Sequence, residues 1–230
     1  MIEFADLQQY LFHECALRDD IDKISNALVE IVENGVPIRV CYESVPVAAL
    51  GAVFSLNVRP QSWQNVIARF CVYSGWDQFD QDHKSLDFLS MLPCVVKEES
   101  AREIFGSRHR TSPKSGILKG EASRQFVEVL GENQIQKKSD ITPERVFGAF
   151  RRIKQIPGQA SGISFVYFLM LLGFDGFVKP DRQVVRYVEK ELGREVRPTY
   201  AAEVVRQSAP KLGVSPAGLD LAIFNRMTQP

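Results

Sequence analysis

Apolar residues recur at helical spacing along most of this 230-residue chain, and nowhere does a strand-like alternation of apolar and polar residues persist. The pattern predicts an all-α fold without internal repeats. The expected helices cover residues 6–17, 20–34, 63–73, 117–130, 142–155, 163–172 and 199–209, with two more that begin near Pro180 and at Ser215-Pro216.

Residues 142–172 read as two helices joined by a tight turn. Thr142 can cap the first helix, Pro143 suits its first position, and Pro157-Gly158 ends it. The second helix can be capped by the Ser161 hydroxyl and is apolar almost all round, which indicates burial. Together they form a helical hairpin.

The turn of this hairpin has the chemistry of a phosphate site. Glycine lets the backbone approach a ligand closely, and the amides of residues 158–161 would lie unpaired at a helix N-terminus. A phosphate there is favoured by hydrogen bonds and by the helix dipole, whatever the base sequence. A Pro-Gly turn by itself is more often a plain connection between helices.

Asp181 follows this hairpin by about two dozen residues and is expected in the first turn of the helix that starts at Pro180. Such a carboxylate usually compensates the helix dipole. Held beside bound DNA, it could instead stabilise the positive charge that develops on a sugar when its base leaves, and orient the attacking water.

Both segments match a known pattern in register. The run Ile156-Pro157-Gly158-Gln159-Ala160 fits hydrophobic-P-G-x-G except that Ala160 replaces the second glycine. The segment that begins at Asp181 fits D-x-x-V-x-R-hydrophobic, with the remaining matches at Val184, Arg186 and Tyr187. The chain therefore resembles the helix-hairpin-helix (HhH-GPD) superfamily of base-excision DNA glycosylases.

The resemblance implies a fold of two interleaved helical lobes with a cleft between them, and Asp181 as the catalytic residue. It implies that the DNA backbone is bound by the turn residues Gly158, Gln159, Ala160, Ser161 and Gly162. Gly162 stands where bifunctional members carry a nucleophilic lysine, and the four-cysteine iron-sulfur loop of some members is missing. A monofunctional enzyme that uses water follows, without a catalytic metal or cofactor. The family's hairpin can also hold a monovalent cation, here at residues 156–161.

The resemblance also divides the chain. Residues 63–230 form the glycosylase-like region, with the hairpin at 145–173 and the catalytic segment at 178–192. Residues 1–62 form an N-terminal extension that packs on this core. Its stretch 36–58 is apolar and less regular, and either builds part of a substrate pocket or only covers the core.

Charge is unevenly distributed, although 28 Lys and Arg balance 28 Asp and Glu. Residues 1–100 carry a net charge of −8, residues 101–160 of +6 and residues 161–230 of +2. The basic segment includes a loop, 105–116, in which Arg108, Arg110 and Lys114 are candidate phosphate ligands. Separate acidic and basic faces can also serve solubility alone.

A side chain after the helix 63–73 is expected to assist base flipping. In the resembling enzymes the corresponding loop fills the gap left by a flipped base, which points to Trp76 or Gln78 as wedge or base-pocket residues. Most tryptophans at a helix end simply pack.

Composition argues against a membrane protein and against a metal-binding protein. No apolar run of membrane-spanning length and no signal-like N-terminus is present, so we expect a cytoplasmic protein, monomeric and without membrane contact. Four scattered cysteines and three dispersed histidines do not form a metal-binding motif.

Three functions remain open. The first is a monofunctional glycosylase acting on double-stranded DNA with a damaged or modified base, in repair or in defence against phages. The second is a noncatalytic helix-hairpin-helix DNA-binding module, and the third a helical scaffold that binds protein. The sequence does not indicate which base would be excised.

Overall fold

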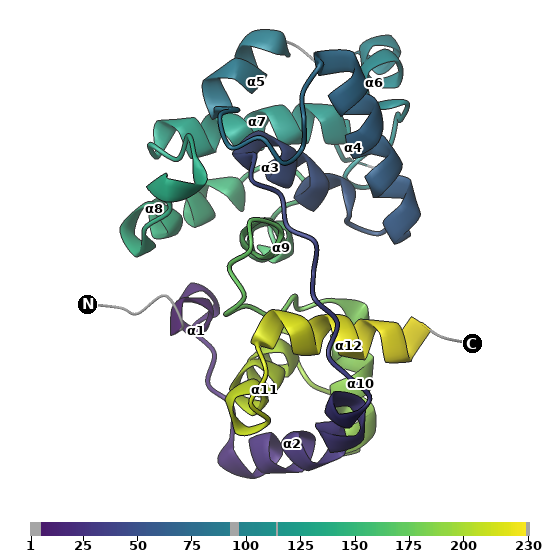
Figure 1. Cartoon of the computed structure of the whole chain (residues 1–230), viewed down its shortest axis with the longest axis vertical. Coiled ribbons are helices and arrows are strands. Elements are labelled where there is room, and N and C mark those ends of the chain that lie inside the picture. The colour runs from purple at the N-terminus through teal and green to yellow at the C-terminus, as the bar shows by residue number, and fades with distance from the viewer. Residues whose placement is uncertain (1–5, 93–96, 114, 229–230) are drawn as a thin grey trace. The chain divides into compact units, whose positions relative to one another are not determined.

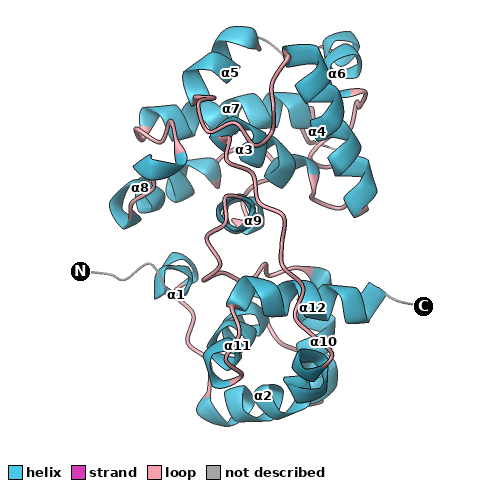
Figure 2. Ribbon diagram, viewed as in Figure 1, coloured by secondary structure: helices cyan, strands magenta, loops and turns pink. Residues whose placement is uncertain are grey.

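The structure is a computed structural model that describes residues 6–92, 97–113 and 115–228. Within these ranges it contains twelve α-helices, and its one strand-like pairing is an isolated bridge between Arg110 and Leu118 (Figure 2). The fold is all-α, which confirms the class predicted from the apolar spacing.

The chain divides into two compact units, and the first is built from both of its ends. Unit 1 comprises Met1–Val40 and Gly173–Pro230, and unit 2 comprises Cys41–Leu172. The boundaries therefore differ from the single division after residue 62 that the resemblance suggested. Residues 41–62 belong to the same unit as the hairpin.

Unit 1 is a cluster of five helices in which α11 and α10 pack on α2 (Figure 1). Its helices are α1 (Leu7–Phe12), α2 (Arg18–Glu33), α10 (Arg182–Leu192), α11 (Pro198–Lys211) and α12 (Pro216–Thr228). The core between them is aliphatic, with Leu28, Val188, Val205 and Leu219 fully buried. Because α2 precedes unit 2 and α10 follows it, this core forms only when the two chain ends meet.

Unit 2 is organised around two apolar helices, α3 and α9, that pack on each other. Its helices are α3 (Val45–Phe54), α4 (Pro60–Ser74), α5 (Ser85–Met91), α6 (Glu98–Phe105), α7 (Lys119–Glu132), α8 (Pro143–Ile153) and α9 (Ile163–Leu171), with a 3-10 turn at Lys138–Asp140. All ten residues of α3 are buried, and α7 covers both central helices through rings such as Phe126, whose centroid lies 5.5 Å from that of Phe168.

Helix α3 lies in the stretch 36–58 that the sequence analysis described as irregular. Its residues are apolar on every side, so no amphipathic spacing marks the helix. The local signals are a Ser44 cap, whose hydroxyl accepts from the amide of Val47, and Pro46 in the first turn. The apolar character of the stretch reflects burial inside unit 2.

Three other helix starts or ends differ from expectation. The first helix is shorter than residues 6–17, because His13 adopts a left-handed conformation (φ 52°) and ends it. Gly162, rather than Ser161, is the cap of α9, although the Ser161 hydroxyl accepts from the amide of Ile163 (3.4 Å). Asp181 is the cap of α10 and not a first-turn residue.

Lys119 shows how a charge can be structural in this fold. The residue is 3 % exposed, and its ammonium group donates to the carbonyl oxygens of Phe54 (3.1 Å) and Leu56 (2.5 Å). Phe54 is the last residue of α3, and Leu56 lies just beyond it. Lys119 therefore satisfies backbone acceptors that helix termini leave unpaired.

Replacing Lys119 by Met should lower the free energy of unfolding by about 1–3 kcal/mol, since it leaves two carbonyl groups without a donor. Urea unfolding followed by circular dichroism measures the change. The matched control is Lys154→Met in the same unit, because Lys154 is exposed and its ammonium group only lies over the Phe150 ring, 5.2 Å from the centroid, a contact that contributes about 0.5–1 kcal/mol. Equal stability of the two variants would contradict the structural role of Lys119.

Candidate functional site

The hairpin turn presents a set of free backbone donors. Gly158 (φ 84°) and Gly162 (φ 74°) both adopt left-handed conformations that favour glycine. The amide of Gln159 donates to the Ile156 carbonyl (2.9 Å), so it is not among the free donors that the sequence analysis expected. Gly158, Ala160 and Ser161 are exposed residues whose amides make no hydrogen bond within the described chain, and they precede the N-terminus of α9.

The basic loop after α6 packs directly on this turn. A Cβ atom added to Gly158 would lie 2.4 Å from Cβ of Thr111 and 2.7 Å from its hydroxyl oxygen. Such distances are far inside van der Waals contact, so glycine is required here by space as well as by φ. The structure thus brings the loop and the hairpin, both predicted to bind DNA, together within unit 2.

Buried polar groups next to the turn lack partners. Both amide atoms of Gln159, which is fully buried, and the Oγ1 atom of Thr111 have no hydrogen-bond partner in the described chain. Buried polar atoms are normally paired, so a bound water would suit these atoms, and the Oε1 atom of Gln159 and the Oγ1 atom of Thr111 could also face a monovalent cation, whereas Nε2 of Gln159 can only donate. The donor set would be neutral oxygens, which suits a weakly bound cation.

Arg108 and Arg110 are exposed but share an acidic neighbour. Both approach Glu98 at the start of α6, at 3.9 Å and 3.3 Å, and Arg110 also donates to the Gly116 carbonyl (3.0 Å). Exposed ion pairs of this kind contribute little to stability. Lys114 lies outside the described residues.

Asp181 caps α10 in unit 1. Its Oδ1 atom accepts from the amides of Gln183 (2.8 Å) and Val184 (3.2 Å), and the side chain is half-buried. Its Oδ2 atom makes no hydrogen bond to a described residue. Capping fixes the orientation of the carboxylate and leaves one oxygen available.

A buried charge cluster holds the segment that leads to Asp181. The carboxylate of Asp220, on α12, pairs with Arg39 (2.6 Å) and accepts from the backbone amide of Lys179 (3.0 Å). One residue earlier, the Val178 amide donates to the side chain of Gln8 (2.8 Å). Side chains from two helices therefore anchor residues 178 and 179 just before Asp181.

The pKa values of Asp220 and Lys179 are shifted within this cluster. The pKa of Asp220 is raised to about 6, mainly by burial and also by the charge of Asp181, whereas Arg39 and Lys179 oppose the shift. Burial lowers the pKa of Lys179, against the attraction of Asp181 and Asp220. Two carboxylates and two cations are thus coupled within unit 1.

Trp76 is packed rather than free. Its ring stacks on His83 (centroids 4.1 Å apart, planes at 16°) and meets Phe70 edge-on at 5.5 Å. The more exposed aromatic ring of the same loop is Phe79, which is 48 % exposed. Gln78 is half-buried. The wedge role of Trp76 or Gln78 stays a prediction.

Arg39 and Asp220 were not expected from the sequence to belong to a site. A signal exists for Asp220, since it interrupts the apolar run of α12 on a buried position, where a charge requires a partner. No comparable signal marks Arg39, because its neighbours Ile38 and Val40 are exposed.

The described part of the chain meets the requirements of neither a metal site nor a membrane span. No group of three His, Cys, Asp or Glu side chains in it could hold a metal ion, and Cys15, Cys41 and Cys71 are not joined in disulfide bonds. None of its helices combines the length and the apolar character needed to cross a bilayer. Cys94 lies outside the described residues.

Comparison with known proteins places the chain in a family. A model of the family described as "Domain of unknown function (DUF8548)" matches residues 21–227. The chain belongs to this family. The match runs from α2 to α12 and so spans both units. No curated protein and no solved structure matches the chain.

Replacing Asp220 by Asn should change how stability depends on pH. The folded-state pKa of about 6 exceeds the usual carboxyl value of 3.8, so the folded state holds this proton longer and loses stability as pH rises from about 4 to about 6. Two pH units correspond to about 3 kcal/mol. Urea unfolding at several pH values should show the variant gaining about 2–3 kcal/mol relative to the parent chain between pH 4 and pH 7. A difference in the free energy of unfolding between variant and parent that stays constant over this pH range would contradict the raised pKa of Asp220.

Proposed function

We propose that the protein is a monofunctional DNA glycosylase that flips a damaged or modified base and hydrolyses its N-glycosidic bond, leaving an abasic site. The observation that carries the proposal is the hairpin turn, whose exposed residues Gly158, Ala160 and Ser161 have backbone amides without a partner in the described chain. Exposed backbone donors at the start of a helix are suited to an anion.

Phosphate is the anion that these surroundings favour. The basic loop with Arg108 and Arg110 packs on the turn through Thr111, so cations and backbone donors belong to one surface of unit 2. Backbone and arginine contacts to phosphate are independent of base sequence, as an enzyme that searches DNA requires.

Asp181 would provide the chemistry. With Oδ1 held by two amides, its other oxygen is free to orient water or to stabilise a sugar that becomes positively charged. Gly162 carries no amine, so water is the nucleophile in this proposal. Lys179 is the lysine nearest in sequence to Asp181, and burial is the main cause that lowers its pKa.

The division into units supports the fold implied by the resemblance. Unit 1 uses both chain ends and carries Asp181, while unit 2 is continuous and carries the hairpin. Interleaved lobes of this kind are what a helix-hairpin-helix glycosylase-like fold with a cleft would require. Repair of the cell's own DNA and defence against modified phage DNA both suit the proposal.

The alternative is a noncatalytic helix-hairpin-helix DNA-binding module. It is favoured by the two hydrogen bonds that Asp181 accepts from the first turn of α10, because they give the carboxylate a structural role. The two functions differ in whether the charge of Asp181 matters once capping is preserved.

Asp181→Asn makes that distinction, since asparagine caps helices as well as aspartate does. We expect base excision to fall about 10²–10³-fold, because stabilisation of the transition-state charge is lost, while DNA affinity is unchanged or higher. Purified protein would be incubated with duplexes carrying different damaged or modified bases, and strand breaks measured after alkali.

Asp181→Ala is the companion variant. It should lose excision to the same extent and also about 1 kcal/mol of stability, because the cap is removed. Near-normal excision by Asp181→Asn would reject the catalytic role and favour the DNA-binding module.

Gly158→Ala tests the hairpin. Its Cβ atom would meet Thr111, so the turn has to move and duplex DNA should bind about tenfold more weakly, regardless of base identity. Fluorescence anisotropy with labelled duplexes measures the affinity. The matched control is Gly193→Ala, which imposes the same left-handed strain (φ 72°) at a position with open space around it.

Equal DNA affinity of the two glycine variants, with circular dichroism showing both folded, would mean that the turn is only a connector. The scaffold hypothesis would then gain over both DNA readings.

A further inference from the structure

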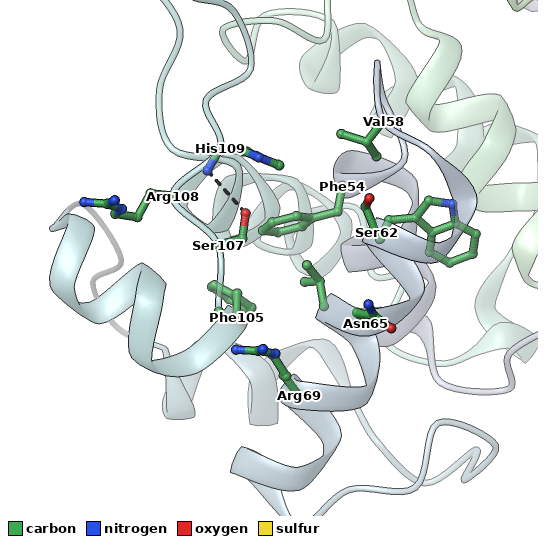
Figure 3. A pocket seen from close by; sticks show the side chains of 12 residues that line it. Phe54, Val58, Ser62, Asn65, Arg69, Phe105, Ser107, Arg108 and His109 are labelled. Atoms are coloured by element: carbon green, nitrogen blue, oxygen red, sulfur yellow. Dashed lines mark hydrogen bonds between the residues drawn. The ribbon is translucent and has the colours of Figure 1, made fainter.

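A cavity of about 480 Å³ lies in unit 2, apart from the hairpin turn, between residues 62–69 of α4 and the loop after α6 (Figure 3). Its apolar wall is formed by side chains such as Phe54, Val58 and Phe105, and Ser62 and Asn65 of α4 add polar groups. The volume lies within the range of small-molecule sites. A single inorganic ion would leave most of it empty.

The rim of the cavity is cationic. Arg69 comes from α4, and Arg108 and His109 come from the loop. No acidic side chain is among the described residues that line it. Arg69 is exposed and forms no ion pair or hydrogen bond with a described residue, so its five donors are available.

Gly106 leaves the space in which the Arg69 side chain lies against the loop. Gly106 has φ 63°, and a Cβ atom added there would lie 2.1–2.6 Å from the Nη1, Cδ and Cζ atoms of Arg69. The guanidinium group thus occupies the space that a side chain at position 106 would need. Beyond it, the Ser107 hydroxyl accepts from the His109 amide (3.3 Å) and turns the loop over the cavity.

We propose that this cavity binds a phosphate group carried by a nucleotide, with Arg69 as the principal ligand. Arginine presents a planar fork that matches phosphate oxygens, and the hydroxyl and amide groups on the wall can donate to the remaining oxygens. The apolar wall leaves room for the sugar or base beside the phosphate.

The source of that phosphate is either a free mononucleotide or the backbone of DNA. The inference goes beyond the glycosylase reaction and does not depend on it, because neither Asp181 nor the hairpin lines the cavity. The loop that carries Arg108 continues to Thr111 on the hairpin turn, so a bound DNA strand could also supply the phosphate.

Isothermal titration of the whole protein with deoxyadenosine 5′-monophosphate, with deoxyadenosine and with a DNA duplex separates these sources. We expect Arg69→Ala to weaken the phosphate-bearing ligand about tenfold or more, because charge-assisted hydrogen bonds are lost. Since Arg69 is exposed, the variant should remain folded. Arg102→Ala is the matched control, being an exposed arginine of α6 outside the cavity, and should bind within about twofold of the parent.

Binding of the monophosphate but not of deoxyadenosine, lost selectively in Arg69→Ala, would identify a mononucleotide site. A selective loss of duplex affinity without monophosphate binding would assign the cavity to a backbone phosphate. The proposal is overturned if Arg69→Ala and Arg102→Ala behave alike, or if deoxyadenosine binds as tightly as its monophosphate. Excision by these variants reports on the glycosylase proposal separately.

Discussion

The geometry of unit 1 depends on the ion pair and the hydrogen bond that the Asp220 carboxylate forms. Asp220 is 4 % exposed, pairs with Arg39 from the chain segment before unit 2, and accepts from the Lys179 amide after it. A buried charge of this kind is costly unless it is paired, and removing one partner is strongly destabilising. The ion pair therefore joins the two chain ends at the position from which Asp181 is presented.

Unit 2 has a different constraint, because it leaves backbone amides of the hairpin turn unpaired within an otherwise folded unit. Two left-handed glycines, Gly158 and Gly162, turn the chain into the buried, largely apolar helix α9. Thr111 then packs on Gly158 and fixes the basic loop. In the proposed function, one unit supplies affinity that is indifferent to sequence and the other supplies the reacting carboxylate.

Elements with a marked apolar stripe or a punctuating residue were predictable. The amphipathic helix α8 was found from its Thr142 cap, Pro143 and apolar spacing, and α9 from its continuous apolar run. Helix α3 was missed because it has no polar face. The charge cluster that precedes Asp181 was missed because Asp220 accepts from the Lys179 amide across 41 residues, and sequence patterns record only local spacing. Capping by Asp181 could be anticipated only to within one position.

The discontinuous make-up of unit 1 sets an order for folding during synthesis. The continuous segment Cys41–Leu172 can complete its core while the ribosome still holds the C-terminal helices, whereas α2 has to wait for α10 and α11. Until then the apolar face of α2, including Ile24 and Leu28, has no partner in the nascent chain. The half of the molecule that carries Asp181 is therefore the last to mature, and a chain interrupted before residue 173 would present the hairpin without the carboxylate.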